Sequence, residues 1–121
     1  MPLKSCMSRR DVAILLDMLI YARRVRDRLR DVPWGAFNDD EDLQLAATHM
    51  IQIVGEAASR SSPELRSQYP QIPWRAIIGM RQRIVHDYMR VRVEVVWDTV
   101  AEDIPPLIDI LESLRLEEDE R

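Results

Sequence analysis

The chain has 121 residues, a formal net charge of −4 and a composition that is 46% hydrophobic and 31% charged, which together indicate one soluble globular domain. The acidic balance disfavours a nucleic-acid binder that reads sequence through a broad basic face, and the single cysteine excludes an intramolecular disulfide. Because the first residues lack an apolar leader and no apolar run approaches the roughly 18 residues of a membrane span, we expect a cytoplasmic protein without membrane contact.

Few glycines and aromatic residues, set against many leucines, alanines, arginines and glutamates, favour helices over a sheet. We expect one helical domain over residues 1–121, with frayed termini at about 1–7 and 116–121. The predicted fold class is all-α, an up-and-down bundle of about four long helices plus a short one.

The first helix is predicted to follow the capping residue Ser8 and to end at about Leu29, before Pro33. Residues 34–37 are expected to form the connecting loop. A second helix should begin at an Asn38 N-cap, and it carries the strongest helical pattern in the chain. Its apolar residues recur at intervals of three or four: Leu43, Ala46, Ala47, Met50, Ile51, Val54 and Ala58.

Three more helices are predicted in the second half of the chain. A Ser-Pro pair indicates a short helix over 62–68. A fourth helix should begin near Pro73 and run toward His86. A fifth is predicted over 94–114, where Pro105–Pro106 must kink or interrupt it because two amide donors are lost.

Residues that could carry chemistry gather at the end of the predicted fourth helix. Arg81 and Gln82 are followed by His86 and Tyr88. An imidazole gives or takes a proton near neutral pH, and the planar guanidinium of arginine suits phosphate oxygens. RNA carries its own nucleophile, the 2′-hydroxyl, so its cleavage needs a base, an acid and a cation rather than a metal. These residues therefore suggest a ribonuclease.

On an ideal helix, Arg81 and His86 are about 140° apart, whereas Gln82 is directly beside His86 and is placed to fix its tautomer. One histidine cannot easily be base and acid in a single step. We therefore expect a symmetric homodimer that brings two Arg81–His86 pairs into one cleft. Arg83 and Arg90 are candidate RNA-binding residues.

These residues also allow plainer interpretations. An arginine and a histidine on one helix are more often surface or dimer contacts than catalysts, and a lone tyrosine is often a core or interface residue. His49, beside Met50, is expected to be a structural or partly buried histidine. Two histidines and one cysteine are too few for a zinc site, so no metal or other cofactor is expected. The arginine run over 23–30 is interpreted as a solvated helix face, with a secondary role in holding RNA as the alternative.

Four sequence blocks occur in order: Ile-Val-Gly-Glu-Ala-Ala at 53–58, Tyr-Pro-Gln-Ile-Pro-Trp at 69–74, Ile-Gly-Met-Arg through Val-His-Asp-Tyr at 78–88, and Val-Val-Trp-Asp at 95–98. With these blocks the chain resembles the HepT-like branch of the HEPN superfamily over about residues 9–115. The Arg-x4-His-x-Tyr pattern is weak by itself, and the blocks on either side make the resemblance specific.

The resemblance implies a small dimeric helical bundle that is the toxin of a bacterial or archaeal toxin–antitoxin module. It implies a metal-independent ribonuclease that uses Arg81 and His86, and transfer RNA is our guess for the substrate. The antitoxin partner would be an MNT-type nucleotidyltransferase that attaches AMP to Tyr88, whose added phosphate would block and repel RNA. Gln82 departs from the small polar residue, often asparagine, that commonly follows the motif arginine.

Two other functions stay open on the sequence alone. The chain could be a non-catalytic module that binds a nucleotide or a nucleotidyltransferase through Arg81, His86 and Tyr88 and cleaves nothing. The acidic net charge and Gln82 favour this alternative. The third interpretation is a structural dimer in which the motif is interface packing.

Overall fold

A computed structural model describes residues 8–84 and 90–116 of the chain. These residues form eight α-helices and one π-helical turn, with no strand among them, which confirms the predicted all-α bundle. No helix in the described part of the chain is both long and apolar enough to cross a membrane.

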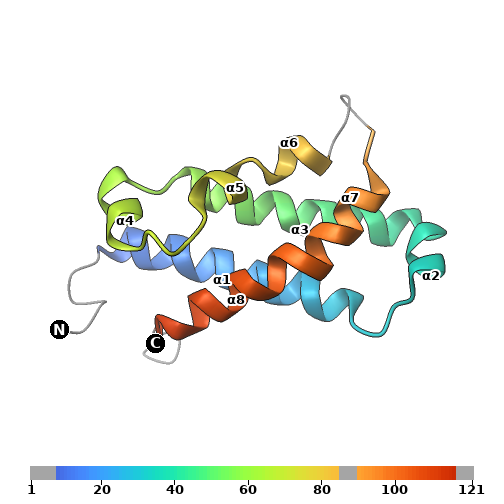
Figure 1. The fold of residues 1–121 in the computed structure, drawn as a ribbon, viewed down its shortest axis with the longest axis horizontal. Coiled ribbons are helices and arrows are strands. Elements are labelled where there is room, and N and C mark those ends of the chain that lie inside the picture. Colours follow the sequence, from blue (N-terminus) through green and yellow to red (C-terminus); the bar gives the residue numbers. More distant parts are fainter. Residues whose placement is uncertain (1–7, 85–89, 117–121) are drawn as a thin grey trace.

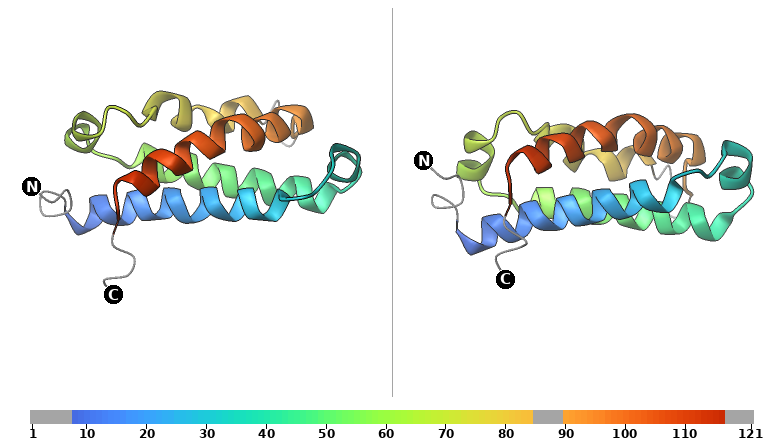
Figure 2. Two further views of the ribbon diagram at one scale, coloured as in Figure 1. Left: turned by 60° about the horizontal axis from the view of Figure 1, so that its bottom comes forward. Right: turned by 90° about the horizontal axis from the view of Figure 1, so that it is seen from below.

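Three long helical segments make the frame of the molecule. Helices α1 (Arg9–Leu29) and α3 (Glu41–Ser59) lie side by side and antiparallel, and a third segment crosses over them (Figure 1). That third segment consists of α7 (Val93–Asp98), the π-turn η2 (Thr99–Asp103) and α8 (Ile104–Ser113). Seen edge-on, α1 and α3 form one layer, and the crossing segment lies in the other layer with α5 and α6 (Figure 2).

The hydrophobic core lies between these two layers. Both layers contribute fully buried aliphatic side chains, among them Leu15, Met18, Leu19, Ile51, Val54, Ile104 and Ile108. Burial extends past the last helix to Leu116, which is 6% exposed and stands at the start of the tail that we expected to fray. Apolar burial of this kind is the main force that holds a small helical bundle together.

Capping residues set the helix starts as predicted at two places. The Ser8 hydroxyl accepts a hydrogen bond from the Asp11 amide at 3.1 Å, and the Ser62 hydroxyl accepts one from the Leu65 amide at 3.0 Å. Helix α4 (Pro63–Gln68) therefore begins with proline in its first turn, where a missing amide proton costs nothing.

The connection between α1 and α3 differs from the prediction. Residues 34–37 are not a loop but belong to a short helix, α2 (Trp34–Asn38), and the N-cap of α3 is Asp40 rather than Asn38. The Asp40 carboxylate accepts from the Leu43 amide at 3.0 Å. The buried Gln44 amide donates to the carbonyls of Phe37 at 2.9 Å and Asn38 at 3.0 Å, which satisfies the end of α2.

The predicted fourth helix is divided into two, α5 (Trp74–Ile78) and α6 (Met80–Ile84), which meet at Gly79. The Gly79 amide still donates to the Arg75 carbonyl at 3.0 Å, and the Gly79 carbonyl accepts from the Gln82 amide at 3.1 Å. The second of these joins residues three apart, as in a 3₁₀-helix, and tightens the backbone at the junction. The helix is thus interrupted at Gly79, just before the motif arginine.

Gly55 controls how closely α5 approaches α3. A Cβ atom built at Gly55 would lie 3.1 Å from the Ile77 carbonyl oxygen, which is closer than ordinary van der Waals contact. A glycine on α3 therefore lets the backbone of α5 pack directly on it, and α6 follows along the same helix.

The proline pair near the start of α8 is accommodated by a wider turn. In η2 the Ile104 amide donates to the Thr99 carbonyl, five residues back instead of four. This widening precedes Pro105–Pro106, whose rings would clash with the carbonyls of a regular α-helix. The predicted interruption therefore takes the form of a π-turn within a continuous helical segment.

We predict that Gly55→Ala destabilises the fold by about 1 kcal/mol, because overpacking against the Ile77 carbonyl outweighs the gain in helix propensity. Gly35→Ala is the matched control, since nothing lies within 4 Å of a Cβ atom there. Urea denaturation of both variants measures the difference, and equal stabilities for the two would contradict the close approach.

Candidate active site

The motif arginine forms an ion pair with a glutamate of another helix. Arg81 Nη1 donates to Glu56 Oε1 at 2.7 Å, and the two side chains are 52% and 50% exposed. The bond joins α6 to α3, between residues that are 25 positions apart in the chain. The cation that the sequence assigns to phosphate binding is thus held by a carboxylate at the surface.

Packing on both helices explains why these two side chains meet. Met80 and Ile84 are buried at 2% and 0% exposure and occupy one face of α6, which leaves Arg81 on an exposed face. On α3, Glu56 directly follows Gly55. The backbone of α5, the helix before α6, makes its close approach at this glycine. The contact of α5 with Gly55 therefore places α6 beside Glu56.

The ion pair is better placed to orient Arg81 than to stabilise the fold. Ion pairs between exposed side chains contribute about 0–1 kcal/mol, because water screens the charges. An arginine has five N–H donors, and the bond to Glu56 uses the Nη1 group alone. Arg81 therefore retains donors in a fixed plane, which a phosphate group could accept.

The other predicted RNA-binding residues lie near Arg81 in sequence but differ in their partners. Arg83 pairs with Asp103 of η2, with Nη2 and Oδ2 3.4 Å apart. Both residues line a pocket of about 260 Å³ between α5, α6 and the η2–α8 segment. Arg90 and Gln82 are exposed. Arg83 is thus partly neutralised by an acid, whereas the surface position of Arg90 leaves it accessible.

His86 and Tyr88 lie outside the described residues, so their predicted roles, and the role of Gln82 beside His86, remain predictions. The described residues on either side are joined, because the Arg92 amide donates to the Ile84 carbonyl at 2.7 Å. The two ends of the segment that contains the motif histidine and tyrosine therefore lie together, at the end of the helix that carries Arg81.

His49 corrects one expectation from the sequence. It was predicted to be structural or partly buried, but it is exposed on α3. The exposed stripe of this helix also holds Leu45, which is 51% exposed, and it continues to Glu56. Position beside the apolar Met50 was misleading, because neighbours in sequence point to different sides of a helix.

Glu56 is the site residue for which the sequence analysis assigned no role. It was visible as part of the Gly-Glu-Ala block and as an isolated acid in an apolar helix. Nothing in the local pattern identifies its partner, since Arg81 lies in a different helix. In the described part of the chain, no group of three or more His, Cys, Asp or Glu side chains is arranged to hold a metal ion.

Comparison with known proteins decides the family. The model of the family described as "Ribonuclease HepT-like" matches residues 18–114, which is most of the chain and contains the whole Arg-x4-His-x-Tyr motif. The chain belongs to the ribonuclease HepT-like family. The resemblance drawn from the four sequence blocks is therefore confirmed, and so is the class of enzyme that it implied, an endoribonuclease.

Individual relatives agree with the family match. The chain is 35% identical over 91 residues to a protein of Thermococcus cleftensis named "Probable ribonuclease HepT", covering 75% of this chain and 83% of the relative. It is 30% identical over 102 residues to a Methanocaldococcus jannaschii protein with a provisional RNase name, covering 84% and 94%. A Caldanaerobacter subterraneus protein with a similar name is 31% identical over 81 residues, covering 67% and 72%. No solved structure matches the chain at a significant level.

We predict that Glu56→Gln changes the free energy of unfolding by no more than about 1 kcal/mol, because the pair with Arg81 is half exposed. Asp103→Asn, which removes the charge from the neighbouring ion pair with Arg83, is the matched variant and should behave in the same way. Urea denaturation at low and high salt measures both. A loss above about 2 kcal/mol for Glu56→Gln would mean that the pair is mainly structural.

Proposed function

We propose that this chain is a metal-independent endoribonuclease and the toxin of a toxin–antitoxin module, with Arg81 and His86 in its active site. The observation that supports this most is the Arg81–Glu56 ion pair at 2.7 Å. It holds the motif arginine at the surface of a chain that belongs to a ribonuclease family. A guanidinium held in this way is ready to receive a phosphodiester.

The chemistry follows from the residues of the motif. A base removes the proton from the 2′-hydroxyl, whose oxygen then attacks the adjacent phosphorus. An acid protonates the 5′-oxygen as its bond to phosphorus breaks, which leaves a 2′,3′-cyclic phosphate and a free 5′-hydroxyl. Arg81 stabilises the additional negative charge on the pentacovalent phosphorane. Because the nucleophile belongs to the substrate, no metal-activated water is needed.

His86 is the group that can move these protons near neutral pH. A single imidazole cannot be base and acid in the same step, so a symmetric homodimer would supply the second one from its other subunit. In this proposal Gln82, which lies on α6 next to Arg81, orients His86 through a hydrogen bond. RNA, with transfer RNA as one candidate, is the substrate.

Tyr88 is the proposed point of control. It follows His86 by two residues, and an MNT-type nucleotidyltransferase would attach AMP to its hydroxyl. The attached group adds both bulk and negative charge beside the proposed catalytic pair, and like charges repel the RNA backbone. Modification at this position would therefore neutralise the toxin.

One observation favours a second candidate function. Glu56 offsets the charge of Arg81, so Arg81 would stabilise the additional charge of a phosphorane less strongly than a lone arginine would. The chain could then be a non-catalytic module that binds a nucleotide or a nucleotidyltransferase through the same residues. This candidate predicts tight binding and no RNA cleavage.

In EDTA, the purified protein should cleave RNA, and Arg81→Ala and His86→Ala should each lower the rate by roughly 10²–10⁴-fold. Arg75→Ala, which removes an exposed arginine from α5, is the charge-matched control and should retain the wild-type rate. Circular dichroism and the mass in solution check folding and association.

The results separate the two candidates. Cleavage that disappears with EDTA would contradict metal independence. Cleavage that persists in His86→Ala would remove that residue from the site. Absence of cleavage by a folded wild-type protein across several RNAs, with tight binding of a nucleotidyltransferase, would favour the binding module.

Co-expression with an MNT-type nucleotidyltransferase should add one or more AMP groups to the chain and abolish its toxicity. Intact-mass and peptide mass spectrometry should locate the addition at Tyr88, and Tyr88→Phe should stay unmodified and toxic. An unmodified Tyr88 beside a partner that is active on ATP would contradict this part of the proposal.

A further inference from the structure

A second pocket lies on the other side of η2 from α6. It has a volume of about 280 Å³ and is mainly apolar, with one aromatic and one cationic side chain. Its walls come from the C-terminal end of α1, the segment that follows it, α7, η2 and α8. The lining residues are Arg26, Leu29, Val32, Trp97, Val100, Ala101 and Pro105.

The aromatic wall of this pocket is held firmly in place. The Trp97 ring lies 5.2 Å from the Phe37 ring and 5.5 Å from the Trp34 ring, measured between centroids. Phe37 is fully buried and ties the cluster to the core, whereas Trp34 is 37% exposed. Trp97 is thus a fixed flat surface between the core and the pocket, with a second, partly exposed indole beside it.

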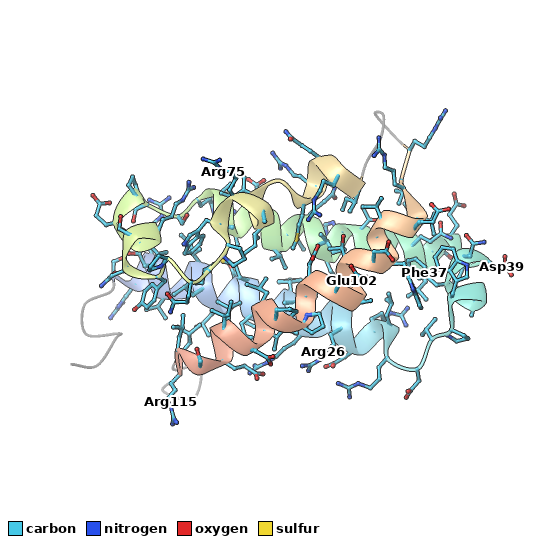
Figure 3. All side chains as sticks on the ribbon, viewed as in Figure 1. Arg26, Phe37, Asp39, Arg75, Glu102 and Arg115 are labelled. Carbon is cyan, nitrogen blue, oxygen red and sulfur yellow. The ribbon has the colours of Figure 1, made fainter. Side chains whose placement is uncertain are left out.

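Among the described residues that line the pocket, Arg26 is the charged one, and the sequence around it is rich in arginine although the whole chain is acidic. Residues 23–31, at the end of α1 and just after it, include five arginines and two aspartates, on a chain whose net charge is −4, and Arg23 is paired with Glu112 at 3.0 Å. Arg26 and Arg30 both bond to Asp27, at 2.9 Å and 2.7 Å, and the hydrogen bond from Arg26 lowers the pKa of Asp27. The Asp27 carboxylate thus bonds to Arg26, which lies next to the η2–α8 segment (Figure 3).

The chemistry of the pocket limits what can occupy it. Its volume is just below the roughly 300 Å³ at which pockets for drug-sized ligands begin, so it suits one flat ring system. The apolar floor and the indole favour stacking, and Arg26 in the lining, with further arginines in residues 23–30, favours a ligand that carries negative charge. A base attached to a phosphate backbone has both properties, and unstacked RNA bases are commonly bound on aromatic and arginine side chains.

We propose that this pocket receives one unstacked base of single-stranded RNA, whose phosphates lie along the arginine-rich end of α1. The inference rests on the proposed ribonuclease function and adds to it a second contact with the substrate.

The position of the pocket relative to Arg81 supports this assignment. Within η2, Asp103 pairs with Arg83 of α6, whereas Val100 and Ala101 line the pocket on the side of α1. The η2 turn, about 10–12 Å across, therefore lies between the pocket and Arg83, which is on the same helix α6 as Arg81. A bound strand could cross this distance in a few nucleotides, so the pocket would select a base close to the cleaved bond.

Binding is tested with a short, fluorescently labelled 2′-O-methyl RNA, which lacks the nucleophile and cannot be cleaved. A matched oligonucleotide without bases measures the backbone contribution alone. At constant salt, the wild type should bind the oligonucleotide with bases about tenfold or more tightly than the abasic one, by fluorescence anisotropy.

Two pairs of variants locate the base. Ala101→Leu fills the pocket from an exposed position and should lower affinity to the abasic level, while Ala13→Leu, on an exposed part of α1, should bind like the wild type. Arg26→Gln should weaken binding more than Arg28→Gln, which removes the same charge from an exposed position outside the pocket.

Equal binding of the two oligonucleotides by the wild type would overturn the proposal, and so would wild-type affinity in Ala101→Leu. If Ala101→Leu does not fold, the comparison of oligonucleotides and the arginine pair still decide the question. Cleavage of unmodified RNA by the wild type is measured in parallel. If the wild type cleaves RNA but binds the two oligonucleotides equally, the ribonuclease function stands and the pocket is rejected. If it binds the oligonucleotide with bases more tightly but cleaves no RNA, the base-binding pocket stands and the ribonuclease function is rejected.

Discussion

The arrangement of the site depends on how closely two backbones approach each other at Gly55. The Ile77 carbonyl oxygen lies 3.1 Å from the place where a side chain would begin, so a Cβ atom at that position on α3 would push against the backbone of α5. Because α5 is held so close, α6 starts beside the next residue of α3, and Arg81 reaches Glu56. A contact between main-chain atoms thus determines which acid partners the motif arginine.

Sequence reasoning located most helices because their signals are local. Apolar periodicity identifies α1 and α3, and Ser62 caps α4 as its Ser-Pro pair indicates. Sequence reasoning failed where two local signals compete, or where a contact between residues far apart in the sequence decides the structure. Asn38 and Asp40 are both good capping residues, and the contact of Gln44 with the end of α2 selects the second.

For the same reason, only part of the candidate site could be proposed from the sequence. Arg81 could be selected because few residue types bind phosphate, and the motif around it lies within one segment of the chain. The partner of Arg81 could not be selected, since Glu56 is 25 residues away in the sequence. Asp103 could not be identified as the partner of Arg83 either, because the two are 20 residues apart. Pairs of this kind depend on how helices cross, which periodicity does not determine.

The π-turn has a further consequence for which changes in length the chain can tolerate. Because η2 holds one residue more than a regular α-helical turn, it offsets the side chains after it by about 100° from where an uninterrupted α-helix of the same sequence would place them. The buried side chains of α8, such as Ile104 and Ile108, face the core only with that offset. Loss of one residue from Thr99–Asp103 would restore a regular α-helical turn and leave this stripe facing the core, but it would set the rings of Pro105–Pro106 against the carbonyls of the preceding turn, so the extra residue is tied to the proline pair.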